Sequence, residues 1–389
     1  MIKKQIFGLD ISDYSIEVLV LTKPFFGKPK IESYARTILR GDVISNGIIK
    51  KPDKLAESLT ALLKSAQPKP IKSRYCVISL PESQVFSTVF KLPAGLKYNE
   101  IKNTIPFKAE EVIPFKSSEV YFDFKRIGVI GQSQEIFYVA IPIKIVDAYV
   151  EVFEKAGLIP VAFDLESNSL ARSLIDVSKK SDGAKLLLDI GARTTNLNIF
   201  DNNGIRQSLT IKIAGDRFTK AIASKLNIKP KDASDLKMKN GFDAEKQDGK
   251  VLLVLQNEFK RIIAETKKFV EYYKSDYGRG VSEVILVGGS SFLPKVDQYL
   301  ADNLEIETNI GKPFGKIADP RELVNLKGKS VLFANVAGLA LRGLDKNPIH
   351  CDINLLPVVP VQFSLAPAKE DRRAWLEVYI RLGVLIILI

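Results

Sequence analysis

The stretch LLLDIGARTTNLNIF at residues 186–200 has two short apolar runs around a small polar turn. This pattern predicts a β-hairpin whose turn carries an Asp, a Gly and two Thr residues. A near-copy of its first half, IFGLDISDYSI, occupies residues 6–16. Asp10 in the copy corresponds to Asp189 in the stretch. The repeat predicts a duplicated domain with a ligand between its two copies.

The two turns are suited to a phosphate-bearing ligand. Glycine lets the backbone approach a phosphate closely, and the N–H groups of such a turn can surround its oxygens. Asp10 and Asp189 can hold a hydrated Mg²⁺ between them. The alternative is that each Asp only stabilises its own turn, as turn aspartates often do. Their matching positions in a repeat favour the ligand.

The composition limits the class of protein. The chain has 389 residues, 46% of them hydrophobic and 26% charged, which is enough for two folded domains. Two Cys and one His exclude a Cys/His metal cluster and a disulfide framework. The net charge of +12 fits an anionic membrane surface, nucleic acid or simple solubility. Scattered lysines without a basic-aromatic face argue against nucleic acid, and the C-terminal segment favours the membrane.

Strand and helix signals are mixed along the whole chain, which predicts the α/β class. The first part is expected to have strands at 15–22, 31–38 and 74–79 and a helix at 52–65. A block from about 85 to 163 is expected to be a small α+β subdomain inserted into the first domain, with strands at 86–92, 120–125 and 135–141 and helices at 98–112 and 145–155. The second part is expected to have strands at 204–213 and 283–291, the latter ending in glycines, and helices at 216–226, 233–239, 251–274, after Pro294 and at 332–344.

In this order, the elements resemble the actin-like ATPase superfamily, a duplicated fold of two ribonuclease H-like domains. The resemblance implies ATP and Mg²⁺ as cofactors. It implies that nucleotide is bound by Asp10, Ser12, Asp189, Gly191, Thr194, Thr195, Gly215, Lys237, Gly288, Gly289, Ser290 and Gly338. Asp10 and Asp189 would hold the metal through water, and Glu166 would orient the attacking water.

Three of these assignments have plain structural alternatives. Glu166 can be an acid that favours a helix start. Gly288 and Gly289 can form an ordinary strand-to-helix turn, and Lys237 can be a solvated helix lysine.

Within the superfamily, the chain resembles the PilM family of type IV pilus assembly proteins over residues 1–344. The features that carry this resemblance are the inserted block, the segment EEVIPF at 110–115 and the strand end at Gly215. The segment DINLLP at 352–357 resembles the N-terminal peptide of PilN, the membrane partner of PilM. Its residues Ile353, Asn354, Leu355, Leu356 and Pro357 are expected to dock in a groove, in cis or in trans, unless they form a core strand.

The domains are expected at 1–180, with the insertion, and at 184–330, followed by a returning helix at 331–345 and a PilN-like tail at 346–389. The tail ends in the apolar run 382–389. This run is shorter than the about 20 residues of a spanning helix, so it is expected to lie at the interface or to belong to a longer span.

The resemblance implies a scaffold on the cytoplasmic face of the inner membrane, in a type IV pilus or related secretion platform. Its expected partners are a PilN-like inner-membrane protein or its own tail, other platform proteins, the membrane surface and a second copy of the chain, but not nucleic acid. An FtsA-like filament protein and a metabolite kinase of the same superfamily are the alternatives. No catalytic Asp beside an acceptor pocket is evident for a kinase.

The first hairpin departs from the PilM pattern, which has Gly, Ser and Lys where this chain has Ser12, Asp13 and Glu17. Ser12 adds a Cβ atom where the backbone is expected to approach phosphate. Asp13 and Glu17 add negative charge, and a like charge about 4 Å from a phosphate costs about 1–4 kcal/mol. We therefore expect ATP binding with weak or absent ATPase activity, since hydrolysis needs further charge stabilisation.

Overall fold

Two five-stranded sheets form the two halves of the protein. The computed structural model describes all residues except 1–4, 177–182, 319–325, 327 and 358–389. The first sheet has the order β10-β6-β1-β2-β3, with β1 (Ile6–Ile11), β2 (Ser15–Thr22), β3 (Lys30–Ile38), β6 (Tyr75–Leu80) and β10 (Ile159–Leu165). The second has the order β13-β12-β11-β14-β15, with β11 (Ala184–Ile190), β12 (Thr195–Asp201), β13 (Gly204–Ile211), β14 (Val281–Val287) and β15 (Thr308–Ile310).

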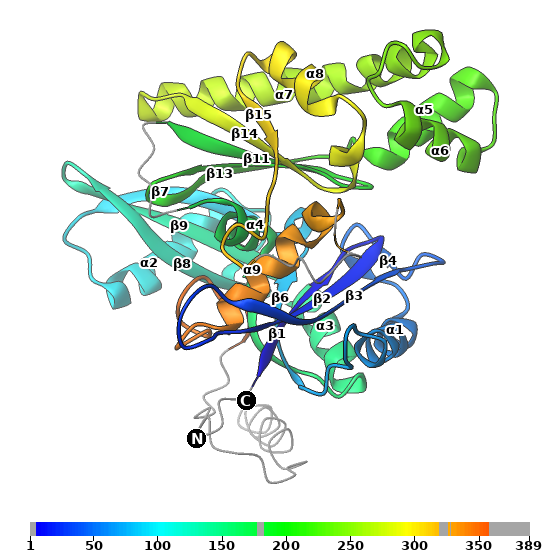
Figure 1. Ribbon diagram of the computed structural model, residues 1–389. Coiled ribbons are helices and arrows are strands. Elements are labelled where there is room, and N and C mark those ends of the chain that lie inside the picture. The colour runs from blue at the N-terminus through cyan, green and yellow to red at the C-terminus, as the bar shows by residue number, and fades with distance from the viewer. Residues whose placement is uncertain (1–4, 177–182, 319–325, 327, 358–389) are drawn as a thin grey trace.

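The two sheets have the same topology. β1 and β11 each pair antiparallel with the next strand of their hairpin and parallel with a strand from later in the chain. Figure 1 shows the second half above the first, with the helices α7 and α8 on its far side. The predicted α/β duplication is confirmed, and it places Asp10 and Asp189 at equivalent positions near the carboxyl ends of β1 and β11.

A three-stranded sheet, in the order β7-β9-β8, is inserted between β6 and α3. Its elements are β7 (Phe86–Pro93), α2 (Tyr98–Glu110), β8 (Val120–Ile130) and β9 (Ser133–Pro142). The insertion therefore ends about twenty residues before the expected boundary at 163. β10 pairs with β6 in the first sheet, and α3 (Ile143–Lys155) packs its buried face into the first core.

The helices follow from local signals. α1 (Pro52–Lys64) begins with a proline, whose missing N–H is not needed at the first helical position. α7 (Lys250–Tyr277) ends at Gly278, whose φ of 67° is the left-handed conformation that commonly ends a helix. The others are α4 (Glu166–Leu174), α5 (Gly215–Leu226), α6 (Pro230–Asn240), α8 (Val296–Leu304) and α9 (Ala334–Gly343).

Shorter elements connect the larger ones. They are the strands β4 (Ile44–Ser45) and β5 (Ile48–Ile49) and the 3-10 helices Glu82–Gln84, Ser117–Glu119, Gln247–Gly249, Gly289–Phe292 and Ser330–Phe333. Within the described part of the chain, no helix combines the length and the apolar character needed to cross a bilayer. The apolar run at 382–389 lies outside the described residues.

α9 returns to the first half and packs between β1 and α4 (Figure 1). α9 packs closely against both neighbours because a glycine lies at each contact. A Cβ atom on Gly8 of β1 would lie 2.5 Å from the carbonyl oxygen of Val336, and one on Gly338 would lie 1.8 Å from that of Ser169. The hydroxyl of Ser169 donates to the carbonyl of Asn335 across the same crossing at 2.6 Å. The returning helix is thus held at backbone distance from the first sheet.

A buried ion-pair network joins the insertion to the second half. Arg206 on β13 donates to Glu135 on β9 at 2.6 Å and to Asp201 at 2.7 Å. Its guanidinium also lies 5.1 Å from the ring centre of Tyr277, and Arg279 pairs with Asp201. Because the Arg206, Glu135 and Asp201 side chains are almost fully buried, this contact fixes the insertion against the second half.

Candidate functional site

A cleft of about 550 Å³ separates the two hairpins, a size typical of small-molecule sites. It collects most of the residues expected to bind nucleotide. Those that line it are Asp10, Ser12, Glu166, Asp189, Gly191, Thr194, Gly215, Lys237, Gly288, Gly289 and Ser290. They come from both halves of the chain, so the cleft depends on the duplicated fold.

Two expected nucleotide contacts are not in the cleft lining. Thr195 is buried beneath the second hairpin, where its hydroxyl donates to the carbonyl of Ile213 at 2.7 Å. Gly338 lies at the crossing of α9 and α4, where its missing side chain allows the close helix contact. Both residues have structural roles. Their positions in the motifs do not show whether a residue lines the cleft or packs behind it.

Acidic side chains gather at the base of the cleft. Burial raises the pKa of Asp10 to about 6, although hydrogen bonds with Asn335 and Ser79 act in the opposite direction. Burial, followed by the charges of Asp10 and Glu82, raises the pKa of Asp189 to about 7. The mutual repulsion of these carboxylates indicates a place where a cation would be favourable.

Glu166 and Glu82 complete this acidic group. Burial raises the pKa of Glu166 well above its ordinary value, and Asp10, Glu82 and Asp189 raise it further. Burial also raises the pKa of Glu82 to about 7. Glu82 lies two residues after the end of β6 and is not among the site residues predicted from the sequence. Its signal was available, because parallel neighbours such as β1 and β6 end at the same edge of a sheet.

The unfolding temperature of the magnesium-free protein is expected to fall as pH rises from about 5 to about 8. Asp10, Glu82 and Asp189 have higher pKa values in the native state than their ordinary values. In this window the native state keeps protons that the unfolded chain has released, so stability is lost as pH rises. A loss of 1 kcal/mol of unfolding free energy lowers the melting temperature by about 2–4 °C in a domain of roughly 150–250 residues. Thermal unfolding across this range, with Asp189→Asn expected to flatten the slope, checks the assignment. A melting temperature that rises with pH would contradict it.

A Mg²⁺ ion fits this acidic base only through water. Among the described residues, no three acidic, His or Cys side chains lie close enough together to hold a metal ion directly. Mg²⁺ commonly keeps several water ligands and takes one or two carboxylates together with substrate phosphates. Asp10 and Asp189 are suited to receive these waters, and a bound ion would lower the electrostatic cost of their charges.

Ser12 closes the first hairpin turn. Its hydroxyl donates to the carbonyl of Ser15 and accepts the N–H of Ser15, both at 3.0 Å. Its own N–H donates to the same carbonyl at 2.9 Å. The side chain therefore lines the cleft while stabilising its own turn.

The extra charges of the first hairpin are both paired. Glu17 forms a 2.7 Å ion pair with Arg36 on β3. Burial, followed by the charge of Asp10, raises the pKa of Glu17 to about 8 despite this partner. Asp13 accepts the N–H groups of Asn46 and Gly47 at 2.6 and 2.8 Å. The expectation that Asp13 and Glu17 add free negative charge toward a phosphate therefore needs correction.

Arg193, in the turn of the second hairpin, crosses to the first half. Its guanidinium lies 3.2 Å from carboxylate oxygens of Asp13 and Asp42 and donates to the hydroxyl of Ser45 at 2.8 Å. The same side chain lies 3.9 Å from Asp216 on α5. These contacts tie the two hairpins together at the mouth of the cleft, a position in which a bound anion would meet the same guanidinium.

The second half contributes glycines where the backbone crowds. Gly288 has a φ of 82°, and a Cβ atom there would lie 2.3 Å from Oδ1 of Asp189. The N–H of Gly215 donates to the carbonyl of Gly191 at 3.0 Å, so α5 begins directly against the hairpin turn. Gly288 and Gly215 allow the turn, α5 and the end of β14 to meet around the cleft.

Lys237 is buried and not solvated. Its ammonium donates to the carbonyl of Gly215 at 2.7 Å and to the hydroxyl of Thr219 at 2.8 Å. Burial lowers its pKa, although the charge of Asp216 acts in the opposite direction. Among the described residues, no carboxylate is recorded within ion-pair distance of this ammonium. A buried cation of this kind favours an anionic ligand or a ligand hydroxyl.

The segment 352–357 packs against the first half of the protein. Ile353 and Leu355 are only 2% and 1% exposed and join the first core. The N–H of Leu355 donates to the carbonyl of Phe163 at 2.9 Å, and the N–H of Phe163 donates to Oδ1 of Asn354 at 3.0 Å. The N–H of Asn354 donates to Asp123 on β8 at 2.8 Å. The segment thus docks between β10 of the first sheet and the inserted sheet.

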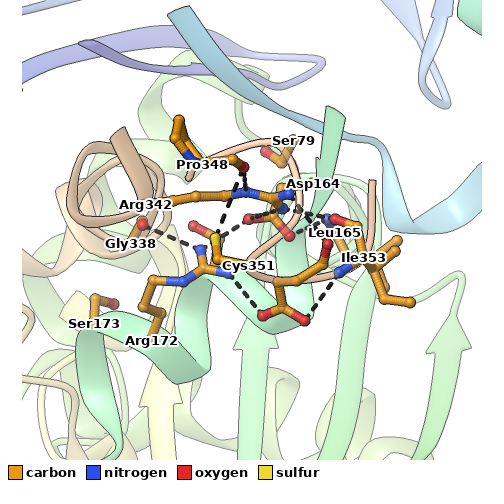
Figure 2. A network of polar contacts seen from close by, with 12 residues as sticks. Ser79, Asp164, Leu165, Arg172, Ser173, Gly338, Arg342, Pro348, Cys351 and Ile353 are labelled. Atoms are coloured by element: carbon orange, nitrogen blue, oxygen red, sulfur yellow. Dashed lines mark hydrogen bonds and ion pairs between the residues drawn. The ribbon is translucent and has the colours of Figure 1, made fainter. Parts of the chain in front are cut away.

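Charged side chains hold the start of this segment (Figure 2). Arg342 of α9 donates to the carbonyl of Ile353 at 2.7 Å and lies 3.0 Å from Asp164. Arg172 of α4 pairs with Asp164 at 2.8 Å and with Asp352 at 3.0 Å. Burial would raise the pKa of Asp352, but the charges of Lys125 and Arg172 hold it below its ordinary value. Asp352 is therefore held by ion pairs with Lys125 and Arg172 at the start of the segment.

Two duplicated sheets around an acidic cleft define the actin-like ATPase fold. The MreB5 protein of Spiroplasma citri, solved with ADP, has a TM-score of 0.50 at 16% identity, covering 87% of this chain and 95% of that one. The ethanolamine utilization protein EutJ of Carboxydothermus hydrogenoformans has a TM-score of 0.53 at 15% identity, covering 86% and 88% of the two chains. These likenesses show the fold.

The family model described as type IV pilus assembly protein PilM matches residues 8–344. The chain therefore belongs to the PilM family. A solved PilM–PilN type IV pilus biogenesis complex has a TM-score of 0.77 at 23% identity, covering 88% of this chain and 99% of that one. The resemblance stated from the motifs is confirmed.

Proposed function

We propose that this protein is a nucleotide-binding scaffold of the inner-membrane assembly platform of a type IV pilus or a related secretion system. Its own segment from Asp352 to Pro357 acts as a docked partner peptide. The observation that supports the proposal is the burial of Ile353 and Leu355 against the first half of the same chain. The solved complex of related fold contains a PilN partner. A PilN-like inner-membrane protein would compete for this surface, and the scaffold would work on the inner face of that membrane.

The cleft of this scaffold binds ATP with Mg²⁺. Asp10 and Asp189 receive the hydrated metal, while Gly288 keeps Asp189 in position. Lys237 meets an anionic or hydroxyl group of the nucleotide. Arg193 and Asp13 already join the two hairpins, so the contact between the two halves does not depend on the nucleotide alone.

Hydrolysis is weak in this proposal. A general base acts in its deprotonated form, and burial together with three neighbouring acids raises the pKa of Glu166. A raised pKa disfavours the deprotonated form of Glu166, and a bound Mg²⁺ would act in the opposite direction. The scaffold therefore responds to bound nucleotide more than to turnover.

One helix connects the two sites. α4 begins with Glu166 in the cleft, and its last turn carries Arg172, which holds Asp352. A shift of this helix on nucleotide binding would change the contacts of the docked segment. This gives the scaffold a physical route from nucleotide state to partner contact.

The Leu355→Asp variant is expected to capture a fluorescent peptide carrying residues 350–357 at least about tenfold more tightly than the wild type. In the wild type, the tethered segment occupies this surface and excludes the peptide. An unpaired carboxylate at the buried Leu355 site is unfavourable, so the variant releases its own segment and leaves the surface open. Fluorescence anisotropy with the full chain measures the difference.

Two variants control this experiment. Leu253→Asp changes a leucine that is 65% exposed on α7 and is expected to leave capture unchanged. Adding Asp123→Ala to Leu355→Asp removes the acceptor of the Asn354 N–H and is expected to weaken capture again. Equal peptide affinity in the wild type and in a folded Leu355→Asp variant would argue against a docked partner peptide.

A further inference from the structure

The loop between β2 and β3 exposes two adjacent phenylalanines. Phe25 is 93% exposed and Phe26 is 84% exposed. Their rings contact only at the tip of the loop, edge to face, with centres 4.6 Å apart. Single apolar side chains on a surface are common, but two neighbouring aromatic rings with almost no burial indicate a contact surface.

Cations surround these rings. Lys23, Lys28 and Lys30 are all exposed, and the segment 23–30 contains no Asp or Glu. We call this segment the Phe25–Phe26 loop. Its chemistry combines apolar rings at the tip with positive charge at the base, which suits a surface that is apolar inside and anionic outside.

The loop has a fixed base on the first half. The Lys28 ammonium donates to the carbonyl of Gly315 at 2.7 Å, and the N–H of Ala318 donates to the carbonyl of Pro29 at 2.7 Å. The same neighbouring segment carries the exposed Lys312. The rings therefore project from an anchored base that adds a further positive charge.

The loop lies at the edge of the first sheet opposite the nucleotide cleft. Asp10 stands near the carboxyl end of β1, whereas the antiparallel register of β1 and β2 brings the end of β2 beside the start of β1. Gly343, at the end of α9, packs against Ile6 at the same edge. In Figure 1 this edge is at the end of the molecule away from the second half. A contact there leaves the cleft open.

We propose that the Phe25–Phe26 loop inserts its two rings into the headgroup and upper acyl region of an anionic lipid membrane, with Lys23, Lys28 and Lys30 against the phosphates. Phenylalanine is among the apolar residues that interfacial segments bury at the boundary of headgroups and acyl chains, and each nearby lysine adds electrostatic attraction. The net charge of +12 acts in the same direction. The inference rests on the proposed membrane-proximal scaffold and names the surface that faces the lipid.

Vesicle binding by the full chain tests this assignment. Flotation is measured with phosphatidylcholine vesicles, with and without phosphatidylglycerol. The double variant Phe25→Ser/Phe26→Ser is expected to partition at least about tenfold more weakly onto the anionic vesicles. It lacks the two aromatic rings that the wild type would bury in the lipid. Phe107→Ser removes a ring that is 70% exposed on α2 and is expected to bind as the wild type does. Equal partitioning of the double variant and the wild type would overturn the proposal.

A fluorescent probe reports on the loop directly. The chain has one Trp, Trp375, so Phe26→Trp in a Trp375→Phe background places the only indole at the loop tip. Its emission is expected to shift to the blue with anionic vesicles and to be quenched by brominated lipid. Emission unchanged by vesicles would overturn the proposal. The peptide capture by Leu355→Asp does not involve this loop, so each experiment can fail without the other.

Discussion

The Arg206→Ala variant is expected to lose about 3–5 kcal/mol of unfolding free energy, because it leaves buried carboxylates without their partner. Arg206 is 3% exposed and bridges Glu135 of the insertion and Asp201 of the second half. Arg279 also pairs with Asp201, so the variant affects Glu135 more than Asp201. Urea unfolding followed by circular dichroism measures the change.

The matched control is an exposed ion pair. Arg217 is paired with Glu258 and its side chain is 56% exposed. Arg217→Ala is expected to change stability by less than about 1 kcal/mol. If both arginine variants unfolded at the same urea concentration, the buried network would not be the joint between the insertion and the second half.

The Gly288→Ala variant is expected to weaken Mg-ATP binding about a hundredfold. A methyl group at this position would lie 2.3 Å from Oδ1 of Asp189 and 2.6 Å from the carbonyl of Ile190. The φ of 82° is itself unfavourable for alanine. The carboxylate must therefore leave the position that we propose for receiving the metal, and misplacement of about 1 Å has large effects in such sites.

The neighbouring glycine supplies the control for the fold. A Cβ atom on Gly289 would meet nothing within 4 Å, so Gly289→Ala is expected to keep the wild-type melting temperature, whereas Gly288→Ala lowers it. Calorimetry gives the affinities and thermal unfolding gives the stabilities. Wild-type affinity in Gly288→Ala would contradict a role for Asp189 beside the metal.

The sequence was most informative where the pattern was local or repeated. The hairpins were predictable because Asp10 and Asp189 sit in near-identical strand and turn patterns. α1 was predictable from Pro52, which begins the helix. β10 was missed as a member of the first sheet, because its partner β6 lies far upstream and pairing between distant strands leaves little local trace. The insertion was consequently drawn too long.

The candidate sites also divide into residues that a local motif predicts and residues that depend on distant contacts. The turn residues of the cleft followed from the hairpin motif, whereas docking of the segment DINLLP as a partner peptide stays a prediction. Glu82 and the partners Arg36 and Arg193 of the extra charges depend on which strands and turns become neighbours. Without the sheet order, Asp13 and Glu17 looked like free charges, whereas the structure pairs each with an arginine.

The cleft is expected to bind Mg-ATP despite Ser12, Asp13 and Glu17 in its first hairpin. Titration calorimetry of the full chain with ATP, in the presence and absence of Mg²⁺, tests this binding most directly. We expect micromolar binding that requires Mg²⁺, because the paired charges of Asp13 and Glu17 do not repel the phosphates. Asp10→Asn and Asp189→Asn are expected to lose this binding. Absence of Mg-ATP binding by the folded wild type would overturn this expectation and leave a scaffold without a nucleotide switch.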